Sequence, residues 1–149
     1  MILKKPPQPV KLLKWPVFFE ATYAHSKAFA FVLDQYNDFI KAGFADTELA
    51  FGNSNMVVYV LDLDKVVGAS VWSYDKLKRS AWILFSAVLP SYRGKGVYKA
   101  LNAEIERRAK NLGAIALYSG MHVDNEPMVT AAAHSGRALN WYRARKALA

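Results

Sequence analysis

Three apolar runs of strand-forming residues follow one another between residues 56 and 89, with only short polar segments between them. The runs are Met56 to Leu61, Val66 to Tyr74 and Ala81 to Leu89. The segments Asp62 to Asp64 and Lys76 to Ser80 have the polar composition of tight turns. Strands joined by such short connections pair antiparallel, so this stretch predicts a three-stranded meander.

A helical pattern replaces the strand pattern after residue 96. Apolar residues recur at helical spacing, Gly113 is a natural helix stop, and a further apolar run covers Ala114 to Met121. Two i,i+4 ion pairs, Glu104 with Arg108 and Glu106 with Lys110, should lie on the other side of this helix. Because the segment from 81 to 121 reads strand, helix, strand, its two strands must run parallel. The apolar stripe of the helix consists of Val97, Leu101, Ile105 and Leu112.

The flanking segments complete an order of β, α, βββ, α, β, α, β. Residues 1–8 hold two of the six prolines and should be an irregular arm. The predicted flanking elements are a strand over Val10 to Trp15 that ends at Pro16, a helix over Thr22 to Lys41 that ends at Gly43, a short helix over Glu126 to Ser135 and a last strand over Ala138 to Ala144. We therefore expect one α/β (α+β) domain over residues 1–149, with a mixed, mostly antiparallel central sheet and helices against it.

The composition is that of a soluble globular protein, with 53% hydrophobic and 21% charged residues. The absence of cysteine excludes disulfides and thiolate metal sites, and three scattered histidines form no ligand cluster, so no metal is expected. The longest apolar stretch is far short of the roughly 20 residues that span a bilayer. No apolar segment follows the basic N-terminus as in a secretory signal. We expect a cytoplasmic protein that does not enter membranes.

The net charge of +8 admits two interpretations. It can serve a polyanionic partner, either nucleic acid or a phosphate-bearing cofactor, or it can be a solvated surface that keeps the protein in solution. Charge alone does not decide between them.

The segment Arg93-Gly94-Lys95-Gly96 lies between a predicted strand and a predicted helix. Glycines there allow close approach of a ligand to the backbone, and the unpaired amides of the first helical turn favour phosphate oxygens. Arg93 and Lys95 add positive charge. The alternative is an ordinary turn whose glycines only satisfy geometry. The spacing fits neither a nucleoside-triphosphate loop nor a dinucleotide-binding fold.

The segment Val88 to Leu101 resembles the acetyl-CoA signature of the GNAT N-acetyltransferases, Gln/Arg-x-x-Gly-x-Gly/Ala. A second segment, Asp124-Asn125-Glu126-Pro127-Met128 with Gly136 beyond it, is similar to the Asn-Glu-x-Ala…Gly-Phe helix of that family. The order of elements agrees with the family's fold as well. The resemblance covers nearly the whole chain and implies a splayed pair of parallel strands, with helices on both faces of the sheet.

The resemblance also implies acetyl-CoA as co-substrate and a primary amine as acceptor, either a small molecule or a protein amino group. The amine would attack the acetyl carbonyl directly. Main-chain groups of Ser86, Ala87 and Val88 would pair with the pantetheine arm, and Asn125 would bind near the pantetheine or thioester. The amides that would hold the pyrophosphate are those of Arg93, Gly94, Lys95, Gly96, Val97 and Tyr98.

Several positions depart from the family's pattern. The positions that often carry the catalytic Glu or Tyr hold Leu84, Gly120 and Ala132, the first motif residue is Ser91, and Arg137 replaces the Phe. These changes put proton transfer in doubt rather than cofactor binding.

Strand alternation places Tyr118 and His122 on the same face as Gly120. His122 is therefore a candidate base, and Tyr118 a candidate donor to the thiolate. The alternatives are a solvated or loop-capping histidine and a packing tyrosine. Tyr98 stands where the family usually has a small residue. It could narrow the loop, but packing in the core is favoured.

Three functions compete. The first is a CoA-dependent N-acyltransferase, and the second is a catalytically degenerate protein of the same fold that binds or assembles without turnover. The third, ranked low, is a nucleic-acid-binding protein, because no stacking motif or reading helix accompanies the basic charge. A homodimer is left open.

Overall fold

The computed structural model describes residues 15–21, 27–42 and 55–119. The described elements are β1 (Val17–Glu20), α1 (Lys27–Lys41), β2 (Met56–Asp62), β3 (Lys65–Asp75), β4 (Ser80–Val88), the 3₁₀ turn η1 (Pro90–Tyr92), α2 (Val97–Leu112) and β5 (Ala116–Ser119). The predicted arm at 1–8, the helix at 126–135 and the last strand at 138–144 lie outside these residues.

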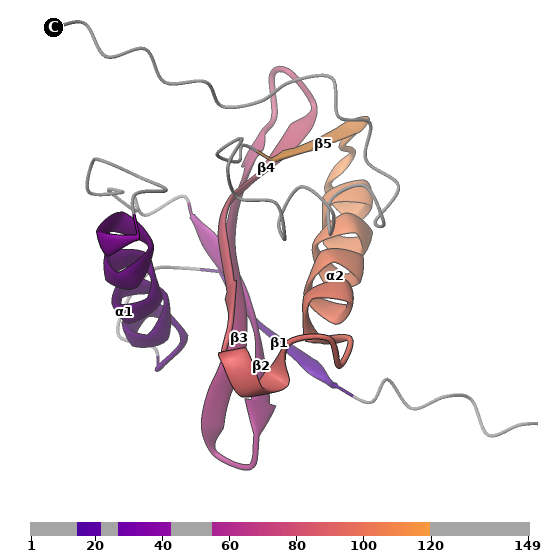
Figure 1. The fold of residues 1–149 in the computed structure, drawn as a ribbon. Coiled ribbons are helices and arrows are strands. Elements are labelled where there is room, and N and C mark those ends of the chain that lie inside the picture. The colour runs from indigo at the N-terminus through magenta and orange to yellow at the C-terminus, as the bar shows by residue number, and fades with distance from the viewer. Residues whose placement is uncertain (1–14, 22–26, 43–54, 120–149) are drawn as a thin grey trace, which may run out of the picture.

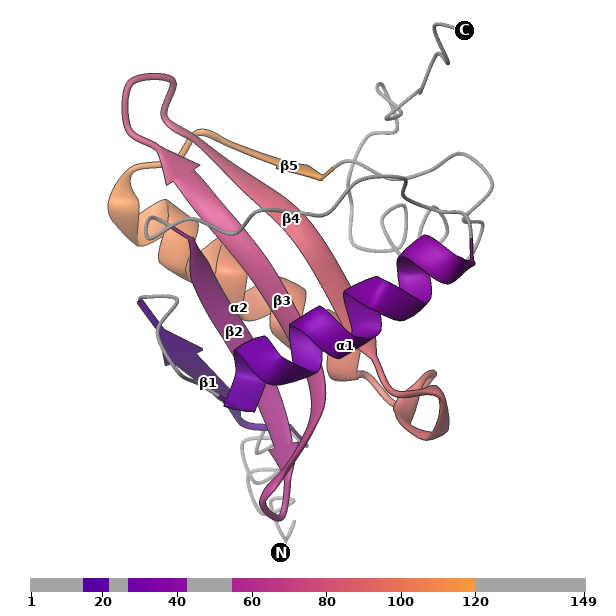
Figure 2. The same cartoon turned by 90° about the vertical axis from the view of Figure 1, so that its left-hand side faces the viewer.

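The described strands form one five-stranded sheet in the order β1-β2-β3-β4-β5. Neighbours pair antiparallel from β1 to β4, and β4 pairs with β5 in parallel. This confirms the predicted meander and the parallel pair. Helix α1 lies against one face of the sheet and α2 against the other, as Figures 1 and 2 show from two directions. The predicted mixed sheet with helices on both faces is therefore confirmed.

One described strand lies where none was predicted. Trp15 lies in a bend, and the described strand begins after Pro16, at Val17, and not before it. Proline cannot donate a hydrogen bond to a ladder, but it is tolerated beside an edge strand, and β1 is the edge of this sheet. Residues 10–14 of the predicted strand lie outside the described part of the chain.

Each face of the sheet carries its own apolar core, the α1-side core beneath α1 and the α2-side core beneath α2. Against α2, Trp72, Leu101 and Ile105 are fully buried. Against α1, the ring of Phe85 meets those of Tyr36 and Phe39 edge-on, with centroids 5.1 and 5.4 Å away. The sheet is thus packed between two helices and forms a rigid support for the loop that follows β4.

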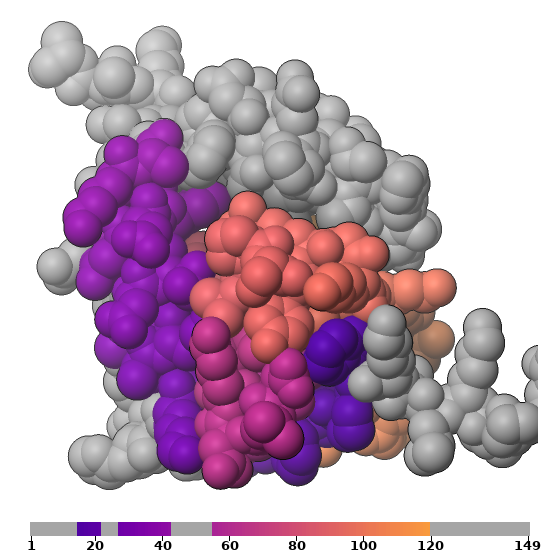
Figure 3. Space-filling view, turned by 60° about the horizontal axis from the view of Figure 1, so that its bottom comes forward, coloured from indigo at the N-terminus to yellow at the C-terminus, as the bar shows by residue number. Residues whose placement is uncertain are grey.

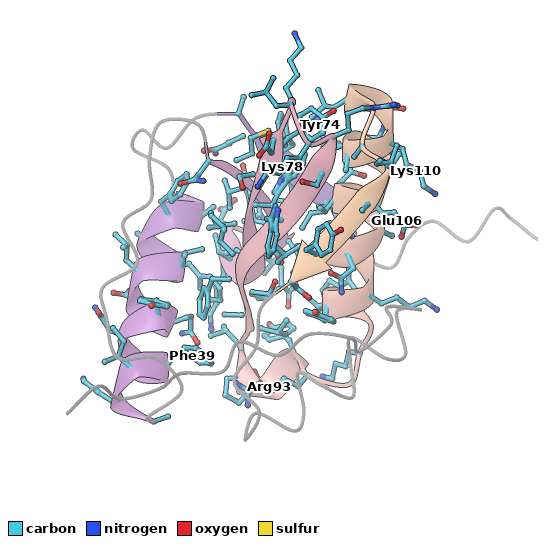
Figure 4. The ribbon with its side chains drawn as sticks, turned by 90° about the horizontal axis from the view of Figure 1, so that it is seen from above. Phe39, Tyr74, Lys78, Arg93, Glu106 and Lys110 are labelled. Carbon is cyan, nitrogen blue, oxygen red and sulfur yellow. The ribbon has the colours of Figure 1, made fainter. Side chains whose placement is uncertain are left out.

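Helix α2 carries both predicted ion pairs, of which that of Glu104 with Arg108 is partly buried and that of Glu106 with Lys110 is exposed. Glu104 meets Arg108 at 2.8 Å and Arg107 at 2.6 Å, and Glu106 meets Lys110 at 3.3 Å. Figure 4 shows Glu106 and Lys110 on the outer side of the helix. The hydrogen bond from Arg107 lowers the pKa of Glu104, with a further contribution from Arg108 that acts against the effect of burial.

The helix ends at Gly113, as predicted. This residue has φ +99°, and its N–H donates to the carbonyl of Lys110 at 3.0 Å. No helix in the described part of the chain is long and apolar enough to cross a membrane.

Candidate cofactor site

The connection from β4 to α2 consists of η1 and a turn over residues 93–96. Gly94 has φ +73° and Gly96 has φ +89°, in the region that side chains with a Cβ rarely adopt. A Cβ added to either glycine would meet nothing within 4 Å. Both glycines are therefore required by the backbone conformation, and the space beside them is open to a ligand.

The first turn of α2 continues directly from this open loop. Gly96 is the N-cap and has no side-chain cap, and its carbonyl accepts the hydrogen bond of Ala100 at 3.0 Å. The first amides of a helix have no acceptor inside the helix, and they lie at the positive end of its dipole. Arg93 and Lys95 add two positive charges to the same loop. This arrangement fits a diphosphate.

The end of β4 presents main-chain groups toward the β5 side. The N–H of Leu89 donates to the carbonyl of Val67 at 2.9 Å, which makes Val88 and its partner Gly68 a non-hydrogen-bonded pair. The N–H and C=O of Val88 therefore point away from β3. By alternation those of Ser86 do the same, whereas the main-chain groups of Ala87 point toward β3.

The pairing of β4 with β5 that the structure describes ends at Ile83 and Ser119. Just beyond it β4 has a bulge, because Phe85 lies opposite Val71 and Ile83 opposite Trp72, which leaves Leu84 without a partner on β3. A bulge bends its strand. The outward groups of Ser86 and Val88 lie past this bend and past the last described pair with β5, where an extended ligand could add as a strand.

Ser86 also forms a buried side-chain contact with β3. Its Oγ lies 2.7 Å from that of Ser70, and both residues are buried. Since a non-hydrogen-bonded pair brings its side chains closest, this contact agrees with the direction of the main-chain groups.

We expect Ser70→Ala to destabilise the fold, because it removes the partner of the buried Ser86 hydroxyl. The expected cost is about 1–2 kcal/mol in free energy of unfolding. Removing both hydroxyls in the Ser70→Ala/Ser86→Ala variant should cost less than the sum of the two single changes. Urea unfolding of the four proteins measures this, and strictly additive costs would show that the two hydroxyls do not interact.

Side chains from three parts of the chain support the loop at residues 93–96 through hydrogen bonds and ring contacts. The Nε1 of Trp15 donates to the carbonyl of Lys95 at 2.9 Å, and its ring meets that of Tyr92 edge-on at 5.8 Å. The hydroxyl of Tyr92 donates to Oδ2 of Asp62 at 2.6 Å, and Nζ of Lys95 lies 5.7 Å from the Tyr92 ring. In Figure 3 the coral surface of this region lies against the indigo start of β1 and the magenta hairpin that joins β2 to β3.

The hydrogen bond to Asp62 raises the pKa of the Tyr92 hydroxyl. Nε of Arg93 donates to the carbonyl of Val88 at 3.1 Å. Figure 4 places Arg93 at the opposite end of the molecule from Tyr74 and Lys78. Sequence reasoning identified the loop but missed Trp15, Tyr92 and Asp62 as its supports.

The remaining predicted site residues lie in different surroundings. Tyr98 is partly buried and packs against the α2-side core, as expected of it. Tyr118 is 42% exposed, and its ring stacks on that of Trp82 with centroids 4.7 Å apart. Both candidate roles of Tyr118, packing and proton donation, are compatible with this position. His122 and Asn125 lie outside the described residues.

Two of the positions that depart from the family's pattern are described. Leu84 is partly buried against the α1-side core at the bulge, and Ser91 is exposed in η1. Gly120, Ala132 and Arg137 lie outside the described residues. Within the described ranges there is no group of three or more His, Cys, Asp or Glu residues that could hold a metal ion.

Comparison with known proteins places this geometry in a family. The model of the "Acetyltransferase (GNAT) family" matches residues 18–136. No curated protein matches the sequence.

Solved structures share the fold at low identity. A ribosomal-protein-alanine N-acetyltransferase from Brucella melitensis biovar Abortus 2308 is 15% identical, with a TM-score of 0.65 over 90% of this chain and 99% of that one. The aminoglycoside acetyltransferase HMB0005 from an uncultured soil metagenomic sample is 14% identical, with a TM-score of 0.67 over 92% and 100%. The aminoglycoside N-acetyltransferase AAC(6')-Iy in complex with CoA is 18% identical, with a TM-score of 0.61 over 88% and 100%.

Proposed function

Since the chain belongs to the acetyltransferase (GNAT) family, we propose that it is a CoA-dependent N-acyltransferase that transfers an acetyl group from acetyl-CoA to a primary amine. The observation that carries the proposal is the open loop at residues 93–96. Its two glycines have positive φ, no described residue comes within 4 Å of a Cβ added to either, and the uncapped start of α2 follows at once. These features match what a diphosphate requires of a protein.

Different segments of the chain would bind different parts of acetyl-CoA. The amides from Gly94 to Tyr98 would hold the diphosphate, since the N–H of Arg93 already donates to the carbonyl of Pro90 at 3.3 Å. The outward main-chain groups of Ser86 and the N–H of Val88 would pair with the pantetheine arm, since the carbonyl of Val88 accepts from Nε of Arg93. Bound acetyl-CoA supplies the thioester. Where β4 bends away at Leu84, the reacting carbonyl would be accessible to an amine.

We assign proton transfer to two side chains. His122 would take a proton from the acceptor's ammonium group, directly or through water, and so free the amine lone pair that attacks the thioester carbonyl, while Tyr118 would donate a proton to the departing thiolate. Asn125 would bind near the thioester. The acceptor is a small-molecule or a protein amine.

The direct test is titration of the purified chain with acetyl-CoA in a calorimeter, followed by an assay of thiol release with a panel of amines. Saturable binding and amine-dependent release of CoA are expected. If neither acetyl-CoA binding nor thiol release occurs, the proposal is wrong.

Tyr118→Phe and His122→Ala should each slow thiol release by at least about a hundredfold, as expected when a positioned acid or base is lost. Affinity for acetyl-CoA should stay unchanged. Phenylalanine keeps the ring that stacks on Trp82, so the Tyr118 variant isolates the hydroxyl. Steady-state kinetics and calorimetry on the same samples measure both quantities, and unchanged rates would remove the assigned role.

One observation favours a second candidate, a protein of this fold that binds CoA without turnover. Leu84 occupies the strand position where the family often has a Glu base, and it packs against the α1-side core. This candidate predicts CoA binding with no thiol release for any amine. Steady release that disappears in the Tyr118 or His122 variant would rule it out.

A further inference from the structure

We infer that Trp15 is a positioning residue for the diphosphate site, and that its indole N–H fixes the direction of the Gly96 amide. The inference rests on the proposed function, because it concerns how the same loop binds CoA. Its starting point is the hydrogen bond of 2.9 Å from Nε1 of Trp15 to the carbonyl of Lys95.

The Lys95 carbonyl and the Gly96 N–H belong to one peptide unit. A trans peptide is planar, and its C=O and N–H point in opposite directions. The described chain has no cis peptide. A donor that holds the carbonyl of Lys95 on the Trp15 side therefore turns the N–H of Gly96 to the opposite side. A hydrogen bond to the carbonyl also polarises the unit and strengthens its N–H as a donor.

This constraint matters because the loop does not fix that peptide by itself. Glycines with positive φ stand on both sides of Lys95, at 94 and 96, and glycine has the widest choice of backbone conformations. The helix N-cap has no side-chain hydrogen bond of its own. An external donor is thus the means by which this peptide is held in one orientation.

Trp15 is itself held in place at the end of the sheet. The register of β1 with β2 pairs Val17 with Val60, so Trp15 lies just beyond the strand end, level with Asp62. There its ring meets the edge of Tyr92, whose hydroxyl is anchored on Asp62 at 2.6 Å. The donor is therefore positioned by the end of β1 and by Tyr92 of η1, and not by the residues 93–96 that it orients.

Two substitutions separate the hydrogen bond from the packing. Trp15→Phe keeps an aromatic ring and removes the N–H. Trp15→His keeps a five-membered ring whose Nε2 stands where Nε1 of tryptophan stands, and removes the six-membered ring. At about pH 8 the imidazole is mostly neutral, so it adds no charge to the site.

Calorimetry should show that Trp15→Phe weakens CoA binding roughly threefold to tenfold, the effect of losing one hydrogen bond. Trp15→His should stay close to the unsubstituted protein. Acetylpantetheine lacks the diphosphate, and its affinity, followed by NMR, should be equal in the two variants and the unsubstituted protein. Equal losses of CoA affinity in both variants, or an unchanged affinity in Trp15→Phe, would overturn the inference.

A measurement on the unsubstituted protein applies even if Trp15→Phe does not fold. Addition of CoA should shift the NMR resonances of the Gly96 amide and the Trp15 indole N–H together, because one peptide unit joins them. A Gly96 shift with an unmoved Trp15 indole would contradict the inference. If the unsubstituted protein does not bind CoA at all, the proposed function fails and not this assignment alone.

Discussion

A Gly96→Ala variant should lose most of its affinity for CoA while it keeps its fold. Gly96 has φ +89°, and a Cβ there projects into the open space where we place the diphosphate. The methyl group would occupy ligand space, and relief of the backbone strain would turn the amide away. Loss of a charge-assisted contact of this kind costs roughly 2–3 kcal/mol, or about thirtyfold to 150-fold in the dissociation constant.

The matched control is Gly113→Ala at the other end of the same helix. Gly113 has φ +99°, and a Cβ there would make an ordinary contact with the Tyr74 hydroxyl at 3.6 Å. Both variants should therefore lose a similar amount of stability, about 1–2 kcal/mol for a left-handed residue with a Cβ. Only Gly96→Ala should lose CoA affinity.

Thermal melts and calorimetry on the two variants measure stability and affinity separately. Parallel losses of affinity in both would mean that α2 as a whole, and not the loop, governs binding. Unchanged affinity in Gly96→Ala would remove the diphosphate from this loop.

The central part of the fold could be predicted because its signals are local. The runs at 56–61, 66–74 and 81–89 alternate with turns too short for anything but antiparallel pairing. The strand at 114 follows a helix, which fixes its parallel direction. Each conclusion needed only neighbouring residues and general rules of chain connection, and the sheet order confirms them.

The position of β1 could not be predicted from such local signals. Pro16 was read as the end of a strand because proline breaks ladders, yet it precedes β1. Proline constrains the residues on both of its sides, and only the pairing of Val17 with Val60 decides which side forms the strand. That pairing joins residues far apart in the sequence, so no local pattern contains it.

At the site, too, only the features that depend on neighbouring residues could be predicted. The loop at 93–96 was found because its glycines and basic residues are contiguous. The donor that orients it, Trp15, is 80 positions away in the sequence. The bulge at Leu84 depends on how β4 registers against β3, and a composition of apolar residues does not reveal it. Sequence reasoning located the ligand-facing groups, whereas their support emerges only from the assembled sheet.

A Gly68→Ala variant should be strongly destabilised, for a reason opposite to that at Gly96. Glycine is required at position 68 because there is no room for a Cβ, and not because of a positive φ. A Cβ at this position would lie 2.6 Å from Cγ1 of Val97 and 3.5 Å from Cδ1 of Leu101. Val97 is the first residue of α2 and is almost fully buried, so the methyl group would push the start of the helix off the sheet. The expected cost is about 1–3 kcal/mol in free energy of unfolding.

Displacement of the helix start should also weaken CoA binding, because the loop at 93–96 ends on it. The double variant Gly68→Ala/Val97→Ala removes the clashing Cγ1, so it should lose less stability than the two single variants lose together, and it should regain CoA affinity relative to Gly68→Ala alone. A double-mutant cycle in urea should give a favourable coupling of about 1 kcal/mol or more, the range found for side chains in direct contact. Additive losses would mean that the close approach of α2 to β3 at Gly68 is not what positions the loop. A coupling in stability without recovery of CoA affinity would separate the seating of the helix from the binding of the diphosphate.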